Sequence, residues 1–211
     1  MRLRTVVLIL GFAVLVPSIA SAQEGRSQDP AAGAVDPAVE AEARQRYRRA
    51  EQERRAAERI RFVAPRRATT IEKLSRWARD YFAPTFTRRI EATQRAVRAY
   101  EEVHRAGQTR YSIAAARRVG DLYLAIATTL ESIPVPIEIR RDPELLRIYQ
   151  TAILDQATPL REQALDSYEA ALRFAERLGQ TTGPHLGRAR AQLQQLAPDR
   201  LPQPAATAPA P

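Results

Sequence analysis

The stretch AVRAYEEVHRAG, residues 96–107, returns 68 positions later as ALDSYEAALRFA, residues 164–175. Each copy places an alanine four residues before a tyrosine, Ala96 before Tyr100 and Ala164 before Tyr168. Residues four apart lie on the same face of an α-helix. The two stretches therefore predict two equivalent helices, each packed through its tyrosine.

The sequence around these stretches is also helical in pattern. Asp36-Pro37 and Asp142-Pro143 are helix-start signals, in which aspartate caps the helix and proline occupies its first turn. Thr70 is expected to cap another helix, and Gly107 is expected to close one. No segment shows the alternating pattern of a strand, so we expect an all-α protein.

Prolines divide the predicted helices. We expect a kink or break at Pro84, a helix over 85–106 and a second over 112–131. The segment IPVPIEIRRDP is expected to be non-helical. A helix starting at residue 143 should meet an interruption at Pro159, helical sequence should continue to Gly179, and a short closing helix should follow over 185–196.

The N-terminus has the layout of a secretory signal peptide, over residues 1–22. Arg2 and Arg4 precede eleven apolar or glycine residues, and Ala20-Ser21-Ala22 matches a cleavage site before Gln23. The apolar run is too short to cross a bilayer, which takes about 20 residues. We expect cleavage and export, to the periplasm of a Gram-negative bacterium or outside the cell, with no transmembrane segment left.

Composition divides the mature chain into four parts. Residues 23–36 form a predicted disordered linker, and residues 197–211 a disordered Pro/Ala tail. Residues 37–63 hold few large apolar side chains and several Glu/Arg pairs four apart, which indicates an exposed helix projecting from the body. Residues 70–196 are expected to form the packed helical domain.

The chain has no cysteine and is basic, with 33 Lys+Arg against 24 Asp+Glu. Disulfides, lipid attachment at the cleavage site, thiol catalysis and cysteine-zinc sites are therefore excluded. Every basic residue except Lys73 is arginine. Either arginine-favouring codon usage or an anionic partner explains this bias, and nucleic acid is a poor partner for an exported protein.

A period of 34 residues, half the offset of the opening repeat, is the spacing of tetratricopeptide helix pairs. The sequence resembles that family over about residues 85–196. Residues at the spacing of its first helix are Ala116, Gly120 and Tyr123; those at the spacing of its second helix are Ala96 and Tyr100, and again Ala164, Tyr168 and Ala171. The resemblance implies antiparallel helical hairpins whose small and aromatic residues pack closely.

The prolines at 84, 134, 136 and 159 fall at unusual places for such units, so the repeats are degenerate. The phrases AAARRVGDLY, IPVP and ILDQATPLREQALDSYEAAL are similar to those of exported tetratricopeptide-repeat proteins of myxobacteria-type bacteria. That similarity implies an envelope protein without implying an activity.

The sequence contains no recognisable catalytic motif. His104 and His185 are the only histidines, and both are interpreted as ordinary helix residues. There is no glycine-rich phosphate loop and no nucleophile elbow. We expect a protein that is not an enzyme and that needs no cofactor or metal.

Two functions remain open. The first is a periplasmic helical-repeat scaffold or adaptor that binds a segment of another envelope protein. In the tetratricopeptide family first-helix side chains line the groove, which implies Arg117, Asp121 and Leu124 as contact residues. The alternative is a cationic binder of anionic envelope surfaces, or a holdase-type chaperone, in which the arginine-rich helix 37–63 binds its client.

Overall fold

A computed structural model describes residues 36–65, 69–107 and 109–201. Over these residues every regular element is a helix, as expected. The predicted signal peptide and nearly all of the predicted linker lie outside the described residues. The predicted tail is wrong for its first residues, because Pro198–Arg200 form a short 3-10 helix, η3. Arg200 fixes this turn by ion pairs to Glu162, Asp166 and Glu169.

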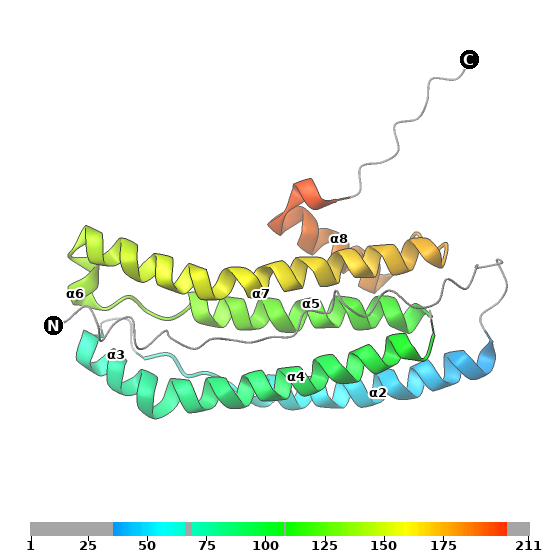
Figure 1. The fold of residues 1–211 in the computed structure, drawn as a ribbon, viewed down its shortest axis with the longest axis horizontal. Helices are drawn as coiled ribbons and strands as arrows, with labels where there is room; N and C mark the ends of the chain where they lie inside the picture. Colours follow the sequence, from blue (N-terminus) through cyan, green and yellow to red (C-terminus); the bar gives the residue numbers. More distant parts are fainter. Residues whose placement is uncertain (1–35, 66–68, 108, 202–211) are drawn as a thin grey trace, which may run out of the picture.

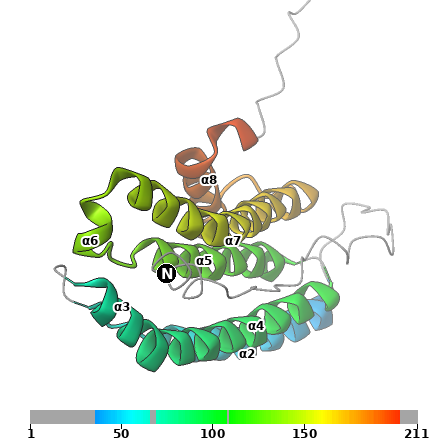
Figure 2. The ribbon, with the colours of Figure 1, turned by 60° about the vertical axis from the view of Figure 1, so that its left-hand side comes forward.

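Long helical stretches run side by side, and consecutive ones are antiparallel (Figure 1). Figure 2 shows the same layers from the end at which α3 and α6 lie. The elements in chain order are α2 (Pro37–Arg59), α3 (Ile71–Trp77), the π-helix η2 (Ala78–Phe82), α4 (Ala83–Arg105), α5 (Arg110–Glu131), α6 (Ile137–Arg140), α7 (Pro143–Arg177), α8 (Pro184–Leu196) and η3.

The predicted cap residues lie where the helices begin and end. The Asp36 carboxylate accepts a hydrogen bond from the Ala38 backbone N–H, and the Asp142 carboxylate accepts two at the start of α7. The Thr70 hydroxyl accepts from the backbone N–H three residues on. Gly107, at φ +122°, follows α4 in a conformation that residues other than glycine rarely adopt.

The prolines interrupt the helices less than expected. The irregularity near Pro84 is the π-helix η2, directly before α4, and the chain stays helical from Ile71 to Arg105. The break expected at Pro159 is wrong, because α7 runs unbroken through it for 35 residues. Proline removes the N–H that would bond the carbonyl four residues before it, here that of Asp155; Pro159 and Asp155 are both exposed, so this carbonyl lies on the solvent side of α7.

The proline-rich segment before α7 is also partly helical. It was expected to be non-helical throughout, which is wrong for the single turn α6, whose first residue follows Pro136 directly. Proline is tolerated just before and within a first turn, where its missing N–H would have no partner within the helix. Ile139 buries this turn against the body.

The expected projecting helix is a packed one, so that prediction is wrong as well. α2 lies along α4, and Ala43, Ala50 and Ala57 are 0% exposed. These alanines are seven residues apart and form one continuous seam. A seam of methyl groups lets two helix backbones approach closely, which the count of large apolar residues did not reveal.

A buried arginine fastens the end of α2. Arg89 of α4 donates to the backbone carbonyls of Ala57 and Ile60, at the C-terminus of α2. Carbonyls in the last turn have no partner within their own helix, and the helix dipole favours a cation there. Phe62 follows and packs its ring against Phe82 and Phe86. The chain that leaves α2 is thereby held to the body.

The second pair of helices is α5 and α7: α5 lies at the centre of the molecule, between α4 and α7, and α8 packs against both helices of the pair. Gly120 is essential to the approach of α5 to α7. A Cβ atom at this position would lie 2.6 Å from the Cε1 atom of Tyr168. Only glycine therefore fits beneath the Tyr168 ring without a shift of the two helices.

The helix lengths depart from a tetratricopeptide unit. Such a unit fits two helices and a turn into 34 residues, whereas α7 alone takes 35. The spacing of 68 residues instead relates two larger pairs, α2 with α4 and α5 with α7. Tyr100 and Tyr168 occupy the later helix of their respective pairs.

Candidate functional site

The two tyrosines of the repeat each donate a hydrogen bond to an acid on the partner helix. The Tyr100 hydroxyl donates to Glu51 Oε1 at 2.6 Å, and the Tyr168 hydroxyl donates to Asp121 Oδ1 at 3.1 Å. The residue before Glu51 is an alanine, and the residue before Asp121 is a glycine. Both pairs thus use a small residue followed by an acid to receive a tyrosine.

Arginines complete the charge network around Glu51. Arg54 Nη2 lies 2.9 Å from Glu51 Oε2, and Arg118 Nε lies 3.0 Å from Glu51 Oε1, without hydrogen-bond alignment in the second case. Burial alone would raise the pKa of Glu51, but hydrogen bonds from Arg54 and Tyr100 outweigh it and lower the pKa to about 2. Glu51 is therefore a stable anion that joins α2, α4 and α5.

Asp121 is the centre of a second network, one turn of α5 beyond Arg117. Arg117 Nη1 lies 2.5 Å from Asp121 Oδ2, and the Arg117 side chain is almost fully buried. Burial lowers the pKa of Arg117, and the Asp121 charge acts against this. Burial and the nearby Asp121 carboxylate also raise the pKa of Tyr168. Tyr168 therefore remains protonated and serves as a donor.

The residues predicted for repeat packing are all buried. Those on α4 and α5 are Ala96, Tyr100, Ala116, Gly120 and Tyr123, and those on α7 are Ala164, Tyr168 and Ala171. Their small and aromatic side chains contribute to one continuous apolar cluster.

The three predicted contact residues have different surroundings. Asp121 and Leu124 line a groove of about 560 Å³ on α5, whereas Arg117 lies beneath the surface at 3% exposure. Arg117 can act on a ligand only through Asp121. Residues three and four apart share a helix face, but the depth of each depends on the helices packed beside it.

The groove is wide open to solvent, and four helices contribute to its lining. We call the lining residues of α5 its floor and those of α2 and α8 its walls. The floor has a mixed polar and apolar surface, and Tyr168 of α7 also reaches the groove. The lining residues are Glu58 from α2, Arg118, Asp121, Leu124, Ala125 and Thr128 from α5, Tyr168 from α7, and Arg188 and Gln192 from α8.

The sequence did not predict the residues of the groove walls. Glu58, Arg188 and Gln192 come from helices distant in sequence, and no local pattern relates them to α5. Arg118 carried a signal, since it is three residues before Asp121 and so shares its helix face.

A second hollow lies at the end of the molecule, between α3, η2, α6 and α7. Its lining is almost entirely apolar and includes Trp77, Phe82 and Tyr149. The Ser75 hydroxyl oxygen borders it, is buried, and has no hydrogen-bond partner among the described residues. With room for about 20 Å³, this hollow accepts little more than one water molecule.

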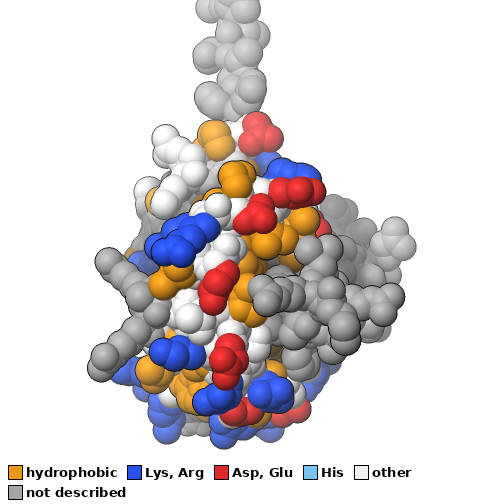
Figure 3. Space-filling model, turned by 90° about the vertical axis from the view of Figure 1, so that its left-hand side faces the viewer, with side chains coloured by type: hydrophobic (Ala, Val, Ile, Leu, Met, Phe, Trp, Pro, Cys, Tyr) orange, Lys and Arg blue, Asp and Glu red, His pale blue; other side chains and the backbone are white. Residues whose placement is uncertain are grey.

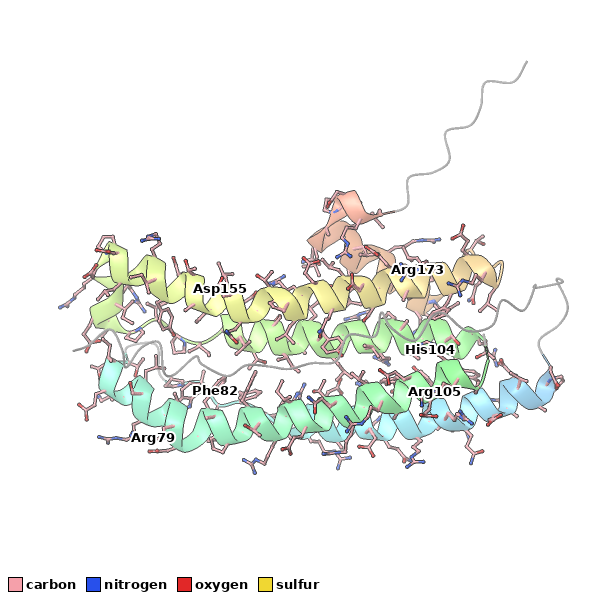
Figure 4. The ribbon with its side chains drawn as sticks, viewed as in Figure 1. Arg79, Phe82, His104, Arg105, Asp155 and Arg173 are labelled. Carbon is pink, nitrogen blue, oxygen red and sulfur yellow. The ribbon has the colours of Figure 1, made fainter. Side chains whose placement is uncertain are left out.

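The histidines are placed differently from one another. His104, labelled in Figure 4, stacks on Phe174 of α7 with ring centroids 4.7 Å apart. Burial lowers the pKa of His104 to about 4. His185 lies at the start of α8, and burial also lowers its pKa.

Among residues 36–65, 69–107 and 109–201, no three His, Asp or Glu side chains form a group that could hold a metal ion. Across the same part of the chain, no helix is both long enough and apolar enough to cross a membrane. No protein-family model, curated protein or solved structure matches this chain.

Proposed function

We propose that this protein is a non-enzymatic helical scaffold, exported to the bacterial envelope, that holds a segment of another envelope protein. The observation that carries the proposal is the groove over α5, with its floor on one helix and walls on two others. The sequence resemblance to tetratricopeptide repeats suggests the same use, because that family binds peptides on the surface of one helix of each pair, although the helix pairs here are longer than its units.

The chemistry of the groove suggests the kind of segment. Leu124 and Ala125 offer apolar surface, and Ala125 is exposed. The acids at the groove, Asp121 and Glu58, already pair with arginines. Arg188 has no acid within ion-pair distance in the described part of the chain. A segment carrying an apolar side chain and a carboxylate fits this surface.

The titration behaviour of Tyr168 and of the charge network beside the groove favours a binding role over catalysis. A general acid or base works best with a pKa near the operating pH. The pKa of Glu51 is held at about 2, and the pKa values of Tyr100 and Tyr168 are raised by burial. These groups therefore keep one charge state throughout the neutral range and serve as fixed contacts.

A crosslinked pull-down from the native envelope tests the proposal. Ala125→Trp fills the groove from its exposed floor and should abolish capture of the partner. Gln150→Trp places the same side chain at an exposed position of α7 that does not line the groove, and should leave capture intact. Thermal melts of both variants establish that the fold is retained.

Salt dependence provides a second measure. A segment held by packing and a few close polar contacts should lose little affinity as ionic strength rises, because buried or partly buried pairs are screened weakly.

In the pull-down, equal capture of the partner by Ala125→Trp and Gln150→Trp would show that the groove is not the binding site.

A further inference from the structure

Four arginines run in a row along the outward face of α2. Arg44, Arg48, Arg55 and Arg59 follow one another by four, seven and four residues, so they share one side of the helix. All four are exposed. We call this row the arginine ridge; at 1.5 Å per residue it is about 22 Å long. In Figure 3, basic side chains, with some acidic ones between them, lie along the lower edge of the molecule, the side of α2 and α4.

The glutamates of α2 are engaged by arginines outside the ridge. Glu40 pairs with Arg110 of α5 at 2.6 Å, and Glu53 lies 3.7 Å from Arg95 of α4. The other three pair within α2 or with α5: Glu42 with Arg46, Glu51 with Arg54 and Arg118, and Glu58 with Arg54.

The positive charge of the ridge is therefore not neutralised. Within the described residues, no carboxylate lies within ion-pair distance of a ridge guanidinium. The contacts that ridge arginines do make are to uncharged acceptors, since Arg44 donates to the Tyr111 hydroxyl and Arg59 donates to the Arg55 backbone carbonyl. Four full charges remain along one side of the helix.

The surface beside the ridge arginines has no large apolar side chain. Ala41, Gln45, Gln52 and Ala56 occupy it, and all four are exposed. A ligand of the ridge is therefore held by charge, without side chains inserted into it. The face is also convex, because it is the outer side of a single helix, and a convex face fits a broad surface better than an extended chain.

We propose that the arginine ridge docks the protein onto a bilayer rich in anionic phospholipid head groups. The planar guanidinium group binds phosphate oxygens in a bidentate manner. Basic side chains near an anionic bilayer add to its attraction one by one. An acidic peptide would need pockets for its side chains, which the groove over α5 offers and the ridge does not.

This inference is independent of the proposed scaffold function, although the two surfaces are compatible. Glu58, at the wall of the groove, directly precedes Arg59 of the ridge. Neighbouring residues point about 100° apart on a helix. A protein held on a bilayer by its ridge therefore keeps the groove open to the side.

Vesicle sedimentation tests the proposal with the full mature chain. The probe is vesicles of phosphatidylglycerol and phosphatidylcholine, compared with vesicles of phosphatidylcholine alone. Replacing Arg48, Arg55 and Arg59 together by glutamine should lower partitioning onto the anionic vesicles by about 100-fold, at about fivefold per arginine. The same three positions changed to lysine should retain most of the binding, and salt should weaken it.

A matched control removes the same charge elsewhere. Arg141, Arg147 and Arg177 are exposed at other places on the surface, and their joint replacement by glutamine should lower partitioning far less. Equal losses in the two triple variants would overturn the proposal, since net charge alone would then explain binding. Failure of the wild type to bind anionic vesicles, or a preference of the ridge for duplex DNA over them, would overturn it as well.

Discussion

Both helix pairs bring two antiparallel helices into close contact, but they do so with different side chains. In the α2–α4 pair, alanines seven residues apart form the seam and Arg89 closes its end. In the α5–α7 pair, Gly120 receives the ring of Tyr168 within a largely apolar interface. The difference shows that a helix rich in charge can be as firmly packed as an apolar one, provided that its small residues are aligned.

The pairs also present different surfaces. α2 turns its arginine ridge outward, whereas α5 is covered on most sides and exposes only Arg110 at its start and Ala125 and Thr128 in the groove. The packing of α2 is therefore the feature on which the comparison depends most.

Removal of α2 should have the largest effect. Deletion of residues 23–58 takes away the partner of Tyr100 and the carbonyl of Ala57 to which Arg89 donates, so the remaining chain should lose its cooperative thermal transition. Circular dichroism melts measure this. Deletion of residues 23–35 alone keeps α2, and the shortened chain should melt as residues 23–211 do. An unchanged melting temperature after the longer deletion would show that α2 does not stabilise the body and would support a projecting helix.

Truncation of the two tyrosines should come next. Tyr100→Ala and Tyr168→Ala each remove a fully buried ring and the hydrogen bond to its acid. Each should lower the free energy of unfolding by about 3–5 kcal/mol, measured by urea denaturation. If only one of the two changes lowers the free energy of unfolding, the two helix pairs are not equivalent and the comparison fails.

A single methyl group at Gly120 should have a smaller effect. Gly120→Ala places a Cβ atom against Tyr168 and should cost about 1–3 kcal/mol by overpacking. Gly187→Ala is the matched control, since its Cβ would meet nothing within 4 Å and alanine favours a helix. Combining Gly120→Ala with Tyr168→Ala should remove most of the cost of the methyl group. If the losses of stability in the two single variants simply add in the double variant, the Cβ atom at position 120 does not contact the Tyr168 ring.

The pH dependence of His104 should give the smallest effect, at the junction between the pairs. Its pKa falls from 6.5 to about 4 on folding, so the unfolded chain binds more protons between these values. Stability should therefore decrease as the pH falls from about 7 to 5.5, by about 1 kcal/mol. His104→Gln should remove this part of the dependence in urea titrations at each pH. A wild-type stability that rises on acidification over this range would contradict the burial of His104.

The helix boundaries could be predicted from sequence because their causes are local. Asp36, Thr70 and Asp142 cap the helices that follow them, and Gly107 ends α4. The prediction at Pro159 failed because a helix can continue through a proline where the carbonyl left without its partner lies on the solvent side. That depends on which side of α7 faces solvent.

The packing of α2 and the lining of the groove depend on helices that are distant in sequence, so local patterns could not predict them. The alanines of the seam have a visible seven-residue spacing, but alanine is common on exposed helices too. Asp121 and Leu124 were predicted from the tetratricopeptide resemblance, which implies contact residues on the first helix of a pair, whereas Arg188 joins them only through the placement of α8. The burial of Arg117 likewise depends on the helices packed beside α5, which its own sequence does not reveal.

Trp77 provides an optical probe of one end of the molecule. It is the only tryptophan of the chain; its Nε1–H donates to the Val63 carbonyl at 3.0 Å, and its ring lies 5.0 Å from that of Phe82. Its intrinsic fluorescence therefore reports on the end where α3, η2 and α6 meet. Far-ultraviolet circular dichroism reports on all the helices at once. An emission change that precedes the loss of helical signal would reveal opening of this end while both helix pairs remain folded.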